Sequence, residues 1–193
     1  MYDEKEEHLT EEDRYFMQKA IDLARAAALR GEVPVGAVIV GAAGGAAVSE
    51  SGGAAVGESG GAAVSMSGGA PGLAAEEGIV GQGSNTCERE KNALCHAEIN
   101  AINDACKKLG RQRLDGFRIY VSLEPCPMCA GAIMNARLDE VIFGAYDKEA
   151  GALWSAEKMY EKPYPKVPGF RGGVCEETCA LLLKDFFEDL RQS

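Results

Sequence analysis

Apolar residues recur at helical spacing in four parts of the chain. Residues 10–31 carry them at every third or fourth position, from Phe16 to Ala27, and Gly31 is a natural stop. Residues 96–109 and 175–190 show the same period, and the second of these runs contains Phe186 and Phe187. A shorter run covers residues 126–136. The spacing therefore predicts four helices.

Continuous apolar runs predict buried strands at residues 35–40, 79–85, 117–123 and 140–143. The last two flank the helix expected at 126–136, an order typical of parallel strands joined by a right-handed crossover. Interleaved helices and strands indicate an α/β sandwich. Residues 163–173 are rich in proline and glycine, and we expect them to form a loop before the last helix.

Residues 43–74 have a different character, because they repeat an octapeptide of glycine, alanine and serine, as in SGGAAVGE and SGGAAVSM. Such a segment buries too little surface to offset its ordering entropy. We interpret residues 41–78 as a flexible insertion between two strands, with a small ordered repeat structure as the alternative. The whole chain, 1–193, then forms a single domain of ordinary size.

Composition and charge narrow the class of protein. About 46% of the residues are apolar, enough for a core, and the net charge of −10 argues against a protein that coats DNA. The acidic start lacks a secretory signal and no stretch suits a membrane span, so we expect a cytoplasmic protein. Seven cysteines without framework spacing favour reduced thiols and a metal site. Two local basic sets remain candidates for phosphate contacts: Lys107, Lys108, Arg111, Arg113 and Arg118, and Lys158, Lys162, Lys166 and Arg171.

Two short segments carry candidate metal chemistry: His96-Ala97-Glu98, and the Pro-Cys-Pro-Met-Cys stretch that contains Cys126 and Cys129. Cysteines three residues apart at a helix start share one face, and the helix dipole favours their thiolates. One His and two Cys make three protein ligands, which leaves the fourth position of a zinc ion for water, as in catalytic sites. Glu98 is not expected to be a ligand, and we assign it the movement of protons.

Each segment alone has an ordinary explanation. An isolated C-x-x-C is often structural or redox-active, and a single His at a helix start is often only a polar residue. Together, H-x-E and P-C-x-x-C form the known signature of zinc-dependent nucleobase deaminases, so its meaning is recognised here and not worked out from spacing. The combination favours one catalytic zinc held by His96, Cys126 and Cys129, with Glu98 as the catalytic residue.

Longer segments resemble the bacterial tRNA-specific adenosine deaminases, within the cytidine deaminase-like superfamily: GEVPVGAVIV, GQGSN, HAEINAI, VSLEPCPMCAGAIMNARLDEVIFGAYD and CALLLKDFF. The resemblance implies a three-layer sandwich with a mixed five-stranded sheet between helices, and a homodimer. It also implies hydrolysis of adenosine to inosine at the wobble position of a tRNA, whose anticodon stem-loop would be the partner. The insertion and residues 157–173 depart from the pattern.

The same resemblance implies four substrate-binding residues. Asn85 would contact the flipped base, Val35 would line its pocket, Asp147 would touch the RNA backbone and Phe187 the anticodon loop. Each has a structural alternative, since Asn85 is typical of a turn, Asp147 of a solvated surface, and Val35 and Phe187 of a core. Two other functions stay open: a deaminase of free guanine, cytosine, nucleosides or dCMP, and a non-catalytic zinc-binding partner subunit. Glu98 speaks against the second, because a scaffold needs no proton carrier.

Overall fold

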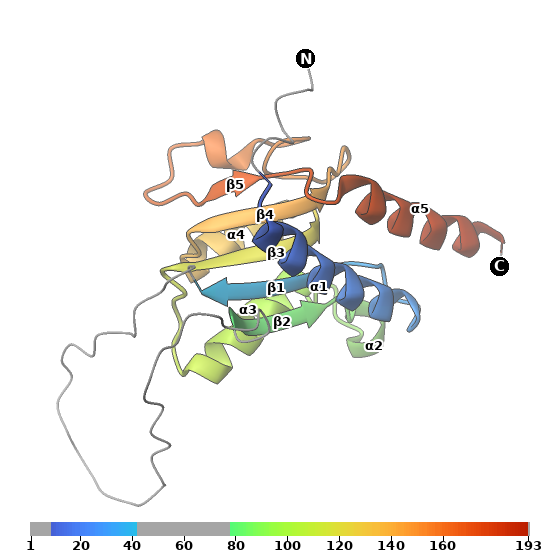
Figure 1. Cartoon of the computed structure of the whole chain (residues 1–193), viewed down its shortest axis with the longest axis horizontal. Helices are drawn as coiled ribbons and strands as arrows, with labels where there is room; N and C mark the ends of the chain where they lie inside the picture. Colours follow the sequence, from blue (N-terminus) through green and yellow to red (C-terminus); the bar gives the residue numbers. More distant parts are fainter. Residues whose placement is uncertain (1–8, 42–77, 193) are drawn as a thin grey trace, which may run out of the picture.

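A computed structural model describes residues 9–41 and 78–192 of the chain (Figure 1). Its centre is a five-stranded sheet in the order β2-β1-β3-β4-β5. β1 is antiparallel to both neighbours, whereas β3, β4 and β5 run parallel, so the sheet is mixed. The strands are β1 (Gly36–Gly41), β2 (Ile79–Ser84), β3 (Phe117–Leu123), β4 (Glu140–Ala145) and β5 (Gly169–Arg171).

Helices cover both faces of this sheet. On one face α3 (Ala97–Leu109) and α4 (Pro127–Ala136) enclose a core with Ile39, Ile119 and Phe143. On the other face α1 (Glu11–Ala28) and α5 (Glu176–Gln192) pack over a second core. The three-layer sandwich predicted above is therefore confirmed. Of the helices in the described residues, none combines the length and apolarity needed to cross a bilayer.

The structure differs from the sequence-based prediction at four places, one of which is a short 3-10 helix, η2 (Met159–Glu161), that was not predicted. β5 lies inside the stretch that we expected to be only a loop, because a strand of three residues is too short for an alternating pattern. A four-residue helix, α2 (Cys87–Glu90), was not predicted. The last helix begins at Glu176, since Cys175 has a left-handed backbone with φ of 55°.

The insertion joins two adjacent strands. β1 ends at Gly41, β2 begins at Ile79, and Val40 pairs with Ile79 in the antiparallel ladder. Residues 42–77 lie outside the described residues, so the expected flexibility of the repeat is not tested. The pairing shows that the two ends of the insertion meet at one end of a hairpin, where a short turn can replace a long loop.

One buried carboxylate connects three parts of the fold. Asp13 is 1% exposed, accepts two hydrogen bonds from the Arg171 guanidinium at 2.9 and 3.0 Å and one from the Tyr120 hydroxyl at 2.9 Å, and completes a capping box with Thr10. Burial alone would raise the pKa of Asp13. The hydrogen bonds from Arg171, Thr10 and Tyr120 outweigh burial and hold that pKa well below 3.8. The start of α1 is thereby fixed to β3 and β5.

Replacement of Asp13 by Asn is expected to lower the free energy of unfolding by about 3 kcal/mol at pH 7, because Arg171 loses its buried partner. The pKa of Asp13 is lower in the folded state than in the unfolded state. Ionised Asp13 therefore stabilises the fold at pH values above the unfolded pKa, and this stabilisation is lost as the pH falls. The difference between Asp13→Asn and the parent should therefore shrink below about pH 4. Urea unfolding at several pH values measures it. Asp22→Asn, which changes an exposed carboxylate on α1, serves as the control and should change little.

We propose that residues 1–193 form one domain that does not need the repeat. Deletion of residues 43–74 should leave the thermal unfolding midpoint and the metal content unchanged, because the hairpin that the segment joins remains closable. Differential scanning fluorimetry and elemental analysis of the deletion protein test this. Aggregation, or a large fall in the midpoint, would show that the repeat is part of the fold.

Candidate metal centre

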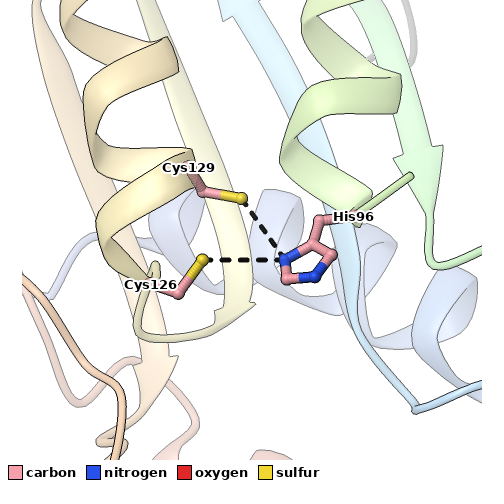
Figure 2. A group of neighbouring side chains, drawn as sticks. All are labelled: His96, Cys126 and Cys129. Atoms are coloured by element: carbon pink, nitrogen blue, oxygen red, sulfur yellow. Dashed lines mark hydrogen bonds between the residues drawn. The ribbon is translucent and has the colours of Figure 1, made fainter. Parts of the chain in front are cut away.

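Two helix N-termini meet on one face of the sheet and bring the predicted ligands together (Figure 2). His96 is the N-cap of α3, and Cys126 is the N-cap of α4, with Pro127 in the first turn. α3 lies close to β2 because Gly83 has no side chain: a Cβ there would lie 2.4 Å from the Ala97 carbonyl oxygen. This close approach holds the start of α3 against the sheet.

The donor atoms have the spacing of a tetrahedral metal site. The Nδ1 atom of His96 lies 3.7 Å from the Cys126 sulfur and 3.5 Å from the Cys129 sulfur. With zinc–nitrogen and zinc–sulfur bonds of about 2.1 and 2.3 Å, the nitrogen–sulfur edge of a tetrahedron is about 3.6 Å. The three donors also lie within 4.8 Å of one another. The residues therefore fit a zinc-sized ion.

The local electrostatics favour ionised sulfur. A hydrogen bond from the Cys129 thiol, then one from the His96 ring, lowers the pKa of the Cys126 thiol to about 4. The same sulfur–sulfur hydrogen bond, together with burial, raises the pKa of the Cys129 thiol. Cys126 is therefore the more easily ionised of the two. Since the thiolate is the form that binds metals, the group is prepared for a cation.

Glu98 stands beside the metal group and is not one of its three members. It lies in the first turn of α3, is only 4% exposed, and is hydrogen-bonded to Cys129. Burial raises the pKa of its carboxyl group to about 7. His96 has extended backbone angles outside the helix, and this explains how two residues only two apart both reach the site. A carboxyl group that gains and loses a proton near neutral pH suits proton transfer.

Asn85 and Val35 are also brought together. The Asn85 backbone N–H donates to the Val35 carbonyl oxygen at 3.0 Å, and each residue is 7% exposed. Asn100 on α3, which the sequence analysis missed, fixes this region. Its amide nitrogen donates to the Ser84 and Cys95 carbonyl oxygens, which precede Asn85 and His96. In the sequence, this role of Asn100 could have been inferred from a polar asparagine among the apolar residues of HAEINAI.

Asp147 and Phe187 are not part of the metal group. The Asp147 carboxylate accepts the N–H groups of Glu149 and Ala150 at 3.0 and 3.1 Å, so it stabilises a turn after β4. Phe187 is 43% exposed on α5, where its ring packs edge-on against Phe186. α5 starts near the carboxyl end of β4 and extends away from the sheet (Figure 1). A role of either residue in RNA binding stays a prediction.

Two buried carboxylates that the sequence analysis missed shape the loops around the site. Glu32 accepts the backbone N–H groups of Glu88 and Arg89 at 3.0 and 2.8 Å. Glu124, two residues before Cys126, accepts the backbone N–H groups of Asp147, Leu153, Trp154 and Ser155 and the Ser155 hydroxyl. In the sequence, their buried roles could have been inferred from the position of each acidic residue inside an apolar segment, GEVPVG or VSLEPC.

The second basic set is largely engaged within the protein. Arg171 pairs with Asp13 and Glu140, and Lys166 pairs with Asp115 and Asp139. Arg118, from the first set, pairs with Glu12. These cations stabilise the fold, and their sequence clustering is therefore a weak indication of a phosphate-binding surface.

Comparisons with known proteins agree with this geometry. The MafB19-like deaminase family matches residues 11–191. The tRNA-specific adenosine deaminase of Bacillus subtilis (strain 168) is 34% identical over 94% of this chain and 92% of its own length. The protein of the same name from Rickettsia typhi is 33% identical over 92% of this chain and 99% of its own length. A solved structure from a study of A-to-I editing by tRNA:A34 deaminases at the wobble position is 31% identical, with a TM-score of 0.66, and covers 87% of this chain and 98% of that chain.

Replacement of Cys126 by Ser should lower the bound metal from about one ion per chain to well below that value, because a hydroxyl is a poor substitute for a thiolate ligand. Elemental analysis of the purified proteins measures the metal. Cys106→Ser is the matched control, since this thiol lies on α3 outside the metal group. A full metal complement in Cys126→Ser would contradict the ligand set.

Proposed function

The chain belongs to the MafB19-like deaminase family and to the tRNA-specific adenosine deaminases, and from this premise we propose the reaction that its site performs. The enzyme hydrolyses adenosine to inosine at the wobble position of a tRNA. The observation that carries the proposal is one His, two Cys and a buried Glu at two adjoining helix starts. One water is consumed: the bond between adenine C6 and its amino nitrogen breaks, a C6–oxygen bond forms, and ammonia leaves.

We propose that His96, Cys126 and Cys129 hold one zinc ion. Zinc in such a site supplies hydroxide near neutral pH, because it lowers the pKa of a bound water from 15.7 to about 7. The carboxyl group of Glu98 takes a proton from the attacking water and delivers it to the departing amino group. Its burial against Cys129 keeps it in reach and excludes bulk water.

Four residues are proposed to bind the substrate. Asn85 and Val35 lie side by side at the ends of β2 and β1, where they can contact a base that has left its stack. Asp147 and Phe187 are proposed to contact the backbone and the loop of the anticodon stem-loop. The acidic net charge argues against a protein that coats DNA. We further propose that the protein is a cytoplasmic homodimer. Analytical ultracentrifugation can measure the mass of the dimer.

The substrate is tested by incubating the enzyme with an anticodon stem-loop that carries a wobble adenosine, and separately with cytidine, dCMP and guanine. Mass spectrometry of the digested RNA should show inosine at the wobble position. The free compounds should remain unchanged. Turnover of the free compounds alone would replace the proposal by a nucleobase or nucleotide deaminase.

Replacement of Glu98 by Gln should lower kcat at least about a hundredfold, because the amide cannot carry the proton. The zinc content should stay at the parent level, since Glu98 is not a ligand. Inosine formation and elemental analysis on the same preparations separate the two effects. Glu11→Gln, a change of an exposed carboxylate on α1, is the control, and undiminished activity of Glu98→Gln would remove Glu98 from the mechanism.

A further inference from the structure

The loop between β4 and β5 is fixed to the segment that leads into the metal centre. Glu124 is 2% exposed, and its carboxylate receives the N–H of Trp154 at 2.7 Å and that of Ser155 at 2.9 Å. The Ala152 N–H donates to the Pro125 carbonyl oxygen at 2.9 Å. Pro125 directly precedes the ligand Cys126. The loop is therefore held by hydrogen bonds at the rim of the site.

The residues of this loop that lie next to Glu124 are closely packed. Gly151 lies against Glu124, where a Cβ would come within 2.4 Å of the carboxyl carbon. Ala152 and Leu153 are fully buried. A loop held by buried backbone and a buried carboxylate presents its next residue in a fixed position, which lowers the entropy cost of binding through that residue.

That next residue is Trp154, whose side chain is 47% exposed. Its backbone N–H donates to the Glu124 carboxylate at 2.7 Å, and this bond does not depend on the identity of the side chain. Tryptophan has a large aromatic face whose burial is strongly favourable, and here that face is half exposed in a loop bonded to the residue before Cys126. The ammonium of Lys158 lies 5.2 Å from the centroid of the indole ring and 3.8 Å from the exposed carboxylate of Glu161. An aromatic face and a cation are thus presented together.

We propose that Trp154 is a stacking platform for a base of the anticodon loop next to the wobble adenosine. The proposal rests on the function proposed above. Proteins recognise single-stranded RNA by stacking unpaired bases on aromatic side chains, with cations beside them for phosphates. When one base is flipped out of the stack, the bases next to it also lose a stacking partner. Trp154 offers such a neighbour an aromatic face on a fixed backbone, and the exposed ammonium of Lys158 exchanges the Glu161 carboxylate for an adjoining phosphate.

The first test uses fluorescence, because Trp154 is the only tryptophan in the chain. The zinc-loaded Glu98→Gln protein binds the stem-loop without converting it. Titration with the stem-loop should quench the tryptophan emission. Stem-loops with an abasic residue on the 5′ or the 3′ side of the wobble adenosine should identify the stacked base by a loss of quenching. Emission that stays unchanged while labelled RNA binds would overturn the proposal.

The second test uses variants of the active enzyme. Trp154→Ala should raise KM for the stem-loop about tenfold, with kcat within about twofold, because a lost stacking contact weakens binding and leaves the chemistry intact. Trp154→Phe should recover most of the loss. Leu109→Ala is the control, since Leu109 is also partly exposed but lies at the far end of α3.

The outcomes separate this proposal from the proposed function. Inosine formation by the parent with an unchanged KM in Trp154→Ala would reject the stacking role alone. Parent enzyme that forms no inosine would reject the function, whereas quenching by RNA would still report the contact. A Trp154→Ala protein that changes its sedimentation mass would place the indole at a protein interface and overturn the proposal.

Discussion

The centre depends on the convergence of two helix N-termini at one point. Each terminus carries about half a positive charge, so their approach is unfavourable unless an anion lies between them. The Cys126 thiol, whose pKa is lowered to about 4, supplies that anion. Because His96 and Cys126 are N-cap residues, their side chains leave the helices and meet in front of both ends. A cation with open coordination then completes an arrangement that the backbone has already formed.

Two buried carboxylates accept hydrogen bonds from backbone N–H groups in the loops around the site. A loop beside an active centre exposes backbone N–H groups that need acceptors once water is excluded. Glu32 supplies one for the α2 turn, and Glu124 supplies one for the loop that contains Trp154. Glu32 therefore joins the α2 turn to the segment before β1, and Glu124 joins the loop after β4 to the end of β3. The loops beside the metal group are held by buried hydrogen bonds for this reason.

Local signals explain what the sequence predicted. The long helices follow from caps and apolar period, and the structure confirms them. His96, Cys126, Cys129 and Glu98 came from a recognised signature, and the structure brings the first three within 4.8 Å of one another, whereas their roles stay a proposal. β5 has three residues and too little pattern, so it was missed. The partners of Glu124 and Arg171 were missed because they are long-range contacts between residues with no periodic relation. Arg171 in particular was grouped with basic residues, although the folded chain uses it to neutralise Asp13.

The engaged cations also bear on how an acidic protein recognises RNA. The chain has a net charge of −10, and Arg118, Lys166 and Arg171 are paired with carboxylates. General attraction of phosphates is therefore a weak source of affinity, whereas it dominates binding by strongly basic proteins. Affinity must instead come from shape, from a pocket for one displaced base and from contacts to its neighbours. In our proposal the half-exposed indole of Trp154, in a loop bonded to the residue before Cys126, supplies such a contact. Because the backbone of this loop is held by the buried Glu124 carboxylate, the contact favours a folded anticodon loop over a random strand.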